Sequence, residues 1–247
     1  MITNELPNTW KDLQNGVGEI LKNCGFSVEI EKKVETVRGQ IELDIYAEEV
    51  IDGRKYSIIC ECKYWKKNIP QSVVHAFRTT VRDLGCDIGY IITTSNFQKG
   101  AIKASKFTNI RLLTWTSFQN CFLESWYKNY YCLQIFICLL PLRKYLNEIY
   151  SISYESSDEN YKKEYQCISI DFRSFDKYMT NHTLYLKHSF RVPALPIRDD
   201  CNISDIEKTK LPMCILNETA FSELLAICIE YVKRGVKRYE ELAHKYK

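Results

Sequence analysis

The sequence lacks the residue spacings that zinc-binding and disulfide-rich domains use. Its 247 residues include eleven cysteines but no CxxC pair, and the four histidines are scattered. Such spacings do not bring ligands together at a zinc site. The one CxC, Cys60 and Cys62, falls on a predicted strand, and we expect both thiols to face the core as apolar fillers. Free thiols are typical of a reducing cytoplasm, which is the compartment that we predict.

Long hydrophobic segments are also missing. The longest apolar run, residues 130–142, contains Gln134 and Pro141 and is followed directly by Arg143. A membrane-spanning helix needs about 20 apolar residues, so we predict no membrane partner. The first ten residues have no basic segment followed by an apolar one, and therefore no signal peptide is predicted. We expect the run 130–142 to be a buried helix or to cover a partner surface.

An excess of charge of one sign is absent too. The chain has 34 basic and 31 acidic residues, a net charge of +3, spread evenly over its two halves. Contacts with nucleic-acid phosphates must therefore come from local basic patches. The two best patches comprise Lys63, Lys66 and Lys67 in one segment, and Lys99, Lys103 and Lys106 in another. Either patch could equally be a solubilising face.

Glycine is scarce after the first hundred residues, where Gly235 alone remains. We therefore predict a first domain over residues 1–118 and a separate region over 119–247. The first domain has helix, strand and turn signals in an α-β-β-β-α-β-α-β order. This order predicts an α/β fold with a mixed central sheet flanked by helices. The predicted elements are a helix at 9–24, an edge strand near 28–30, strands at 41–48 and 56–63, a helix at 70–84, a strand at 88–93 buried on both faces, a helix at 98–106 and a strand at 110–115.

The second region is predicted to be mostly helical, of an α+β type. Its role is open among oligomerisation, sensing of a trigger and substrate binding. The predicted elements are a helix at 119–149, a loop at 151–166, strand-like segments near 167–173 and 183–192, a rigid extended connection at 192–196, and a long helix from 217 to about 245 that is broken or bent near Gly235.

An Asp-Gly pair in the first domain sets the geometry of a candidate site. Asp52 and Gly53 separate two strand-like segments, which is a strong signal for a two-residue hairpin turn. Paired positions then sum to 105, so Asp44 faces Glu61, and Glu42 faces Lys63. Facing Cβ atoms lie about 5 Å apart, and Lys63 projects on the same side as Glu61. The alternative is a solvated strand face with an ordinary salt bridge.

Two facing carboxylates repel each other, and burial increases that cost. A divalent cation would remove the penalty. Hard cations such as Mg²⁺ bind carboxylate oxygens and keep several waters, which leaves room for a phosphate and an attacking water. Lys63 beside the cation could hold that water or offset charge on the phosphate. For an isolated ExK triplet, however, the solvated strand face with a salt bridge is the preferred interpretation, because charged triplets of this kind are common.

The motifs in this region resemble those of the PD-(D/E)xK nucleases, in particular the Mrr-like restriction endonucleases. The similarity covers about residues 9–118, and the elements occur in the order typical of that family. Its segments are Trp10–Gln14 (WKDLQ), Val17–Leu21 (VGEIL), Gly25–Phe26, Arg38–Asp44 (RGQIELD), Ile59–Lys63 (ICECK), Gly89–Gln98 (GYIITTSNFQ), Gly100–Ala101 and Asn109–Trp115 (NIRLLTW).

The resemblance implies a restriction-endonuclease-like fold and a metal-dependent endonuclease that hydrolyses phosphodiester bonds in DNA. It implies Mg²⁺ or Mn²⁺ held by Asp44, Glu61 and the backbone carbonyl of Cys62, with Lys63 as the catalytic lysine. Many relatives carry a glutamate early in the first helix, where this chain has Gln14, with Glu19 five residues later. A neutral amide is a weaker ligand than a carboxylate, so a second metal site is in doubt.

Helical spacing distinguishes the auxiliary candidates. Trp10, Leu13, Val17, Ile20, Leu21 and Cys24 form one apolar stripe, with Gln14 at its border and Glu19 nearly opposite. We therefore expect Gln14 to reach the site and Glu19 to be a surface acid. Gln71, at the start of the next helix, is a third candidate, although a glutamine in that position is more commonly exposed.

The resulting prediction is a DNA endonuclease in prokaryotic defence against foreign DNA. One alternative is a repair or recombination nuclease that acts on branched DNA. Another is a non-cleaving member of the fold that binds nucleic acid or protein. Because each site of this type cuts one strand, we expect a homodimer formed through residues 119–247.

Overall fold

In the computed structural model, residues 1–155, 158–189, 192–199 and 209–246 are described. The chain forms two compact units, one of Glu5–Asn129 and one that combines Met1–Asn4 with Tyr130–Lys247. The predicted boundary after Phe118 lies inside helix α4 (Trp115–Trp126). Each unit is described by itself below.

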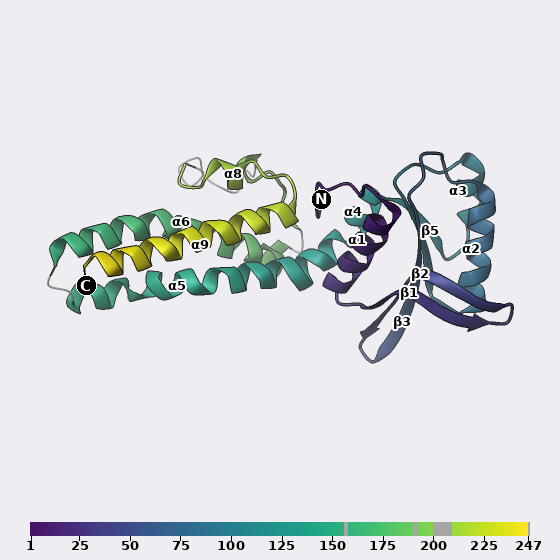
Figure 1. Ribbon diagram of the computed structural model, residues 1–247, viewed down its shortest axis with the longest axis horizontal. Helices are drawn as coiled ribbons and strands as arrows, with labels where there is room; N and C mark the ends of the chain where they lie inside the picture. The colour runs from purple at the N-terminus through teal and green to yellow at the C-terminus, as the bar shows by residue number, and fades with distance from the viewer. Residues whose placement is uncertain (156–157, 190–191, 200–208, 247) are drawn as a thin grey trace. The chain divides into compact units, whose positions relative to one another are not determined.

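The first unit is a mixed five-stranded sheet with strand order β1-β2-β3-β4-β5. Strands β1 to β3 are antiparallel, and β3 to β5 are parallel. Helices α1 and α4 lie on one face of the sheet and α2 and α3 on the other (Figure 1). The predicted α/β class and element order are confirmed. The bounds are α1 (Trp10–Asn23), β1 (Ser27–Thr36), β2 (Gly39–Ile51), β3 (Arg54–Lys63), α2 (Gln71–Asp83), β4 (Ile88–Thr93), α3 (Lys99–Ser105) and β5 (Ile110–Thr114).

Helix α1 begins at a capping box in which Thr9 and Asp12 exchange side-chain and backbone hydrogen bonds. It ends before Gly25, whose φ of +105° few other residues adopt. The predicted apolar stripe is buried from Leu13 onward, but Trp10 is 40% exposed.

The hairpin between β2 and β3 has the predicted turn and register. Asp52 and Gly53 both have positive φ, 50° and 76°, as a type I′ turn requires. The strand pairs run from Ile51–Arg54 to Ile45–Cys60, and their positions sum to 105 as predicted. The thiols of Cys60 and Cys62 are buried, also as predicted.

A kink interrupts β1 and β2 at the level of Asp44. Glu31, which lies across from Asp44 on β1, has φ +56° and is missing from an otherwise continuous ladder. On β2, Leu43 and Tyr46 both pack on the cluster formed by α2, α3 and the sheet. Residues three apart in a regular strand face opposite sides, so strict alternation breaks between them. At the kink, Asp44 therefore does not follow the regular alternation of side chains along β2.

The regular secondary structure of the second unit is helical in all of its described parts. The predicted strand near 167–173 was wrong, because these residues belong to helix α6. The predicted strand near 183–192 was wrong up to residue 189, where α6 ends, and residues 190–191 lie outside the described residues. The predicted loop at 151–166 is also helical up to Glu155 and from Glu159. Side chains at three- and four-residue spacing are buried against neighbouring helices, and this packing favours the helix. The elements are η1 (Tyr127–Tyr131), α5 (Cys132–Glu155), α6 (Glu159–Ser189), η2 (Ile197–Asp199), α8 (Met213–Leu216) and α9 (Phe221–Lys245).

Gly235 does not break α9, which is continuous from Phe221 to Lys245. A Cβ at this position would lie 2.8 Å from ring atoms of Phe172 in α6. The glycine therefore allows two helices to approach closely, and the predicted break was wrong. Residues 192–196 have no regular secondary structure. No helix within the described ranges is long and apolar enough to cross a membrane.

Candidate active site

The site begins where the pairing of β2 with β3 ends. Beyond the pair Ile45–Cys60, the N–H of Cys62 donates to Asp44 Oδ2 at 2.6 Å instead of to a backbone carbonyl. The predicted opposition of Asp44 and Glu61 is therefore not a rung of the ladder. At the kink beside Glu31, the Asp44 carboxylate occupies the position where the next backbone hydrogen bond between β2 and β3 would form.

Glu61 and Lys63 project from the end of β3 and form an ion pair with each other. Their side chains are 28% and 21% exposed, so the pair is open to solvent on one side. The carbonyl of Lys63 accepts a hydrogen bond from Thr93 Oγ1 at 2.8 Å, and Thr93 is fully buried on β4. This bond fixes the backbone from which the lysine projects.

The carboxyl group of Asp44 is held in an unfavourable environment. Burial raises its pKa, and the negative charge of Glu61 raises it further, whereas the hydrogen bond from Cys62 and the charge of Lys63 lower it; together these effects bring the pKa of Asp44 to about 6. Glu31 adds a smaller upward effect. The nearby carboxylates of Glu61 and Glu31 thus carry the same charge as Asp44. A bound cation would offset the repulsion among them.

Gln14 is brought to the site as predicted. Its side chain is fully buried, and its Nε2 donates to the main-chain carbonyl of Asp44 at 3.1 Å. Its Oε1 is buried and has no hydrogen-bond partner among the described residues. An orphaned amide oxygen beside a carboxylate is costly unless a ligand completes it. Glu19 is exposed on the same helix.

The other auxiliary candidates lie on the surface. Gln71 is exposed, forms a hydrogen bond with His75 at 2.8 Å, and lies beside Gly100. No contact within the described ranges joins it to the two carboxylates. Lys66 and Lys67 are exposed in the loop after β3, and Lys99 and Lys103 are exposed on α3.

The donors at the site suit a hard cation. Asp44 and Glu61 supply carboxylate oxygens, and Gln14 supplies the unpartnered amide oxygen. Oxygen donors of this kind fit Mg²⁺ or Mn²⁺. No group of three or more histidine, cysteine, aspartate or glutamate side chains suited to a metal ion occurs in the described part of the chain. Two carboxylates are enough for Mg²⁺, which keeps several of its waters.

Sequence reasoning missed Glu31. Its charge acts on Asp44, and its own carboxylate pairs with Lys11 at 2.5 Å. A positive φ at a glutamate is uncommon. No sequence pattern marks it, because the kink arises from the packing of both strands.

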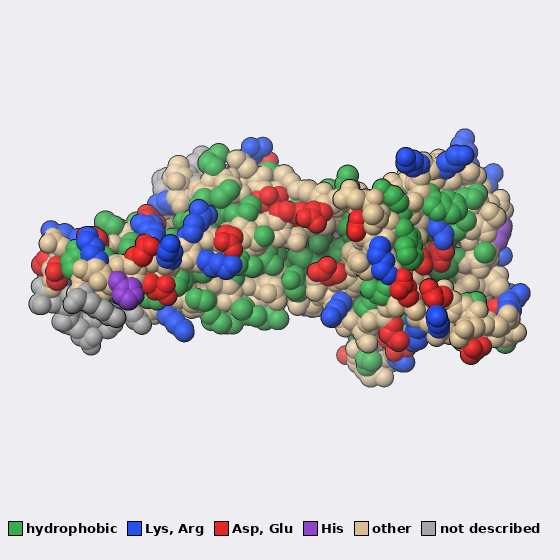
Figure 2. Space-filling model, viewed as in Figure 1, with side chains coloured by type: hydrophobic (Ala, Val, Ile, Leu, Met, Phe, Trp, Pro, Cys, Tyr) green, Lys and Arg blue, Asp and Glu red, His purple; other side chains and the backbone are tan. Residues whose placement is uncertain are grey.

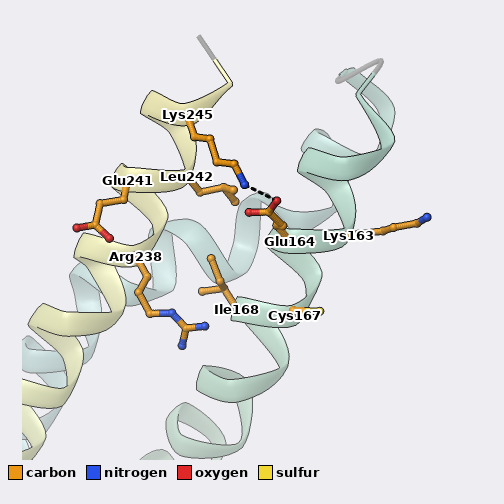
Figure 3. Close-up of a pocket in the computed structure, with 8 residues that line it drawn as sticks. All are labelled: Lys163, Glu164, Cys167, Ile168, Arg238, Glu241, Leu242 and Lys245. Atoms are coloured by element: carbon orange, nitrogen blue, oxygen red, sulfur yellow. Dashed lines mark hydrogen bonds and ion pairs between the residues drawn. The ribbon is translucent and has the colours of Figure 1, made fainter.

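A hollow in the second unit lacks a group of side chains comparable to the carboxylates and lysine of the candidate active site. It lies between α6 and α9, and its lining residues are drawn in Figure 3. Lys245 pairs with Glu164 at 2.7 Å, and Arg238 pairs with Asp171 at 3.0 Å. Since these cations are paired with carboxylates of the same unit, the hollow is a charged surface between helices.

The mixed sheet, with Asp44 on β2 and with Glu61 and Lys63 at the end of β3, defines a restriction-endonuclease-like nuclease domain. Residues 7–122 match the restriction endonuclease family Mrr_cat. The match covers just under half of the chain and confirms the resemblance. No curated protein matches the sequence significantly.

A solved structure described as "Protein of Unknown Function AF1548" is also similar to this chain. The two sequences are 15% identical, and the superposition covers 70% of this chain and 95% of the other, with a TM-score of 0.38.

Proposed function

We propose that the protein is a divalent-metal-dependent endonuclease that hydrolyses phosphodiester bonds in DNA. The observation that carries this proposal is the cluster of Asp44, Glu61, Lys63 and the orphaned Gln14 oxygen in a domain of a restriction endonuclease family. Asp44 and Glu61 would hold Mg²⁺ or Mn²⁺, together with the carbonyl of Cys62. The cation would polarise the scissile phosphate and activate water.

The side chains supply the remaining chemistry. Lys63 places an ammonium group beside Glu61, where it can orient the attacking water or offset the charge that develops on the phosphate. The N–H of Cys62 holds one oxygen of Asp44 and thereby leaves the other oxygen for the cation. Gln14 fixes the backbone of Asp44 by donating a hydrogen bond to its carbonyl.

We further propose a role in prokaryotic defence against foreign DNA. Repair or recombination on branched DNA is the alternative with the same chemistry. The described cysteines are free thiols, and burial raises the pKa of Cys24 to about 12, which keeps that thiol neutral. This state of the cysteines supports a cytoplasmic location.

The proposal is tested by incubating the purified protein with plasmid, linear, branched and RNA substrates in Mg²⁺, Mn²⁺ or EDTA. Cleavage of DNA is expected with either metal and none in EDTA. Lys63→Ala should lower the cleavage rate about 10²- to 10³-fold, the cost of losing one charged group that stabilises a transition state. It should retain metal binding, measured by calorimetry with Mn²⁺, because an ammonium group is not a ligand.

Lys33→Ala is the matched control, since Lys33 is an exposed lysine on β1. It should cleave at the wild-type rate. Wild-type activity in Lys63→Ala would remove the lysine from the mechanism. Cleavage of any DNA substrate in EDTA would contradict the metal requirement.

We also propose that the protein acts as a homodimer through α5. The apolar run 130–142 is divided between two sides of this helical segment: Tyr131, Ile135, Leu139 and Leu142 are buried within the second unit. On the other side, side chains at i, i+3, i+4 and i+7 are 43–52% exposed, and hydrophobic side chains gather along α5 in Figure 2. A second copy can cover this stripe with an identical one. Its members are Leu133, Phe136, Ile137 and Leu140.

Ile137→Glu is expected to convert the dimer to a monomer, because it places carboxylates in a desolvated apolar interface. Sedimentation velocity measures the mass, and a supercoiled plasmid reports the product. The monomer should nick the plasmid while double-strand breaks decline about tenfold, since each site cuts one strand. Ile170→Glu on α6, at a position 66% exposed, is the control and should remain dimeric. A wild-type protein that is monomeric at the assay concentration would contradict the proposal.

A further inference from the structure

A groove opens next to the candidate active site, in the same unit. Its volume is about 540 Å³, within the range of roughly 300–1,000 Å³ typical of small-ligand sites. The loops that follow strands β3 and β4, the junction of β5 with α4 and the segment before α1 form its walls. The lining includes Tyr64, Trp65, Lys66, Asn68, Thr94 and Asn96.

Aromatic side chains connect this groove to the catalytic lysine. Tyr64 and Trp65 follow Lys63 directly in the sequence and are 39% and 43% exposed. Lys63 Nζ lies 5.8 Å from the centre of the Trp65 ring. A molecule held on Trp65 is therefore adjacent to the group that acts on the phosphate.

The walls of the groove are held in place by hydrogen bonds. The N–H of Ile69 donates to the carbonyl of Asn96 at 2.8 Å, and Ser95 Oγ donates to the carbonyl of Lys67 at 3.0 Å. These bonds join the loop after β3 to the loop after β4. On the other side, Trp115 Nε1 donates to the carbonyl of Glu5 at 3.1 Å and holds the segment before α1. The groove is thus preformed.

The polar groups of the groove are mostly uncharged. In the part of the chain that the structure describes, no hydrogen bond engages the side chains of Asn68, Thr94 or Asn96, although all three line the groove. Amide and hydroxyl groups match the donor and acceptor pattern of base edges. Lys66 is the one charged residue of the lining. This composition suits a base better than a run of phosphates.

We propose that the groove binds an unpaired nucleobase beside the scissile phosphate, so that the preferred substrate is a junction of duplex and single-stranded DNA. A paired base is stacked inside the duplex and presents no free face, whereas an unpaired base can stack on an exposed aromatic ring. The inference rests on the proposed nuclease function, because it places the base relative to the site of hydrolysis.

The test compares a blunt duplex with the same duplex carrying a single-stranded extension. Dissociation constants are measured by fluorescence anisotropy in EDTA at one salt concentration, so that no cleavage occurs. The wild-type protein should bind the extended duplex more tightly. Trp65→Ala should weaken that binding about tenfold and change the blunt duplex less than twofold. Trp65→Phe, which keeps an aromatic face, should retain most of the preference.

Two further variants separate the groove from general effects. Asn96→Ala, which lies away from Lys63 in the sequence, should also reduce the preference for the extended duplex. Trp10→Ala removes a tryptophan that is similarly exposed, at 40%, but lies outside the groove, and it should bind like the wild type. A 2-aminopurine at the first unpaired position should be quenched by the wild-type protein and not by Trp65→Ala.

Equal affinity of the wild type for both duplexes would overturn the inference. So would an equal loss for both substrates in Trp65→Ala. The failure of the nuclease proposal is a separate result, namely no cleavage of any DNA with Mg²⁺ or Mn²⁺. In that case a selective loss in Trp65→Ala would still establish the base-binding groove.

Discussion

Replacing Asp44 by asparagine is expected to lower DNA cleavage about 10²- to 10³-fold and, at the same time, to make the metal-free protein more stable above pH 6. Cleavage falls because a neutral amide is a poor substitute for a carboxylate ligand. Stability rises because the carboxylate of Asp44 is partly buried near Glu61. The asparagine oxygen can still accept the hydrogen bond from Cys62.

The pH dependence follows from the raised pKa. Below the ordinary value of 3.8, Asp44 is protonated in both the folded and the unfolded state, and the substitution changes nothing. Between 3.8 and about 6 the unfolded state ionises first, so the wild-type protein loses stability as the pH rises. Above pH 6 the asparagine variant should be more stable by about 1 kcal/mol, or roughly 2–4 °C in melting temperature.

Thermal unfolding in EDTA at pH 4 and pH 8 measures the effect. Glu19→Gln serves as the control, because Glu19 is exposed on α1 and should change neither stability nor cleavage. An equal difference in melting temperature at both pH values would show that the charge of Asp44 is not its cause.

Replacing Gly89 by alanine is expected to destabilise the nuclease unit by about 3 kcal/mol, or roughly 10 °C in melting temperature. Gly89 lies on the buried strand β4, and a Cβ there would be 2.5 Å from Val81 Cγ2 and 2.8 Å from Phe77 Cε1. Both atoms belong to α2, so the added methyl group would push this helix away from the sheet. Circular dichroism at increasing temperature measures the loss.

Gly100→Ala is the matched control. A Cβ at this position would meet Gln71 Oε1 at 3.0 Å, which is the end of an exposed side chain that can move. This substitution in a helix should be neutral or slightly stabilising. Combining Gly89→Ala with Val81→Ala should recover part of the lost stability, because the second change removes the closest atom. A wild-type melting temperature in Gly89→Ala would contradict the close packing of α2 on β4.

Local signals predicted most of the first unit. An Asp-Gly pair at positive φ determined the hairpin register, and the apolar run at 88–93 marked a strand that is buried almost entirely. Helical spacing placed Gln14 at the edge of the buried face, from which it reaches Asp44. These features depend on neighbours in the sequence, so the residues themselves specify them.

The second unit was harder to predict because its segments fit two periods. Ile168, Ile170 and Phe172 alternate as in a strand, yet Ile170 is 66% exposed while the other two are buried on α6. Phe172, Phe175 and Met179 continue the burial at helical spacing. Packing between α5, α6 and α9 decides in favour of the helix.

Asp44, Glu61 and Lys63 were recognisable as candidates from one turn, the alternation of two strands and the resemblance to a nuclease family. How these side chains meet depends on tertiary packing. The kink at Glu31 replaces the expected rung with a hydrogen bond from Cys62 to Asp44. Burial then raises the pKa of Asp44 and leaves an oxygen of Gln14 without a partner. Burial and like-charge repulsion depend on groups far apart in the chain, so no local pattern specifies them.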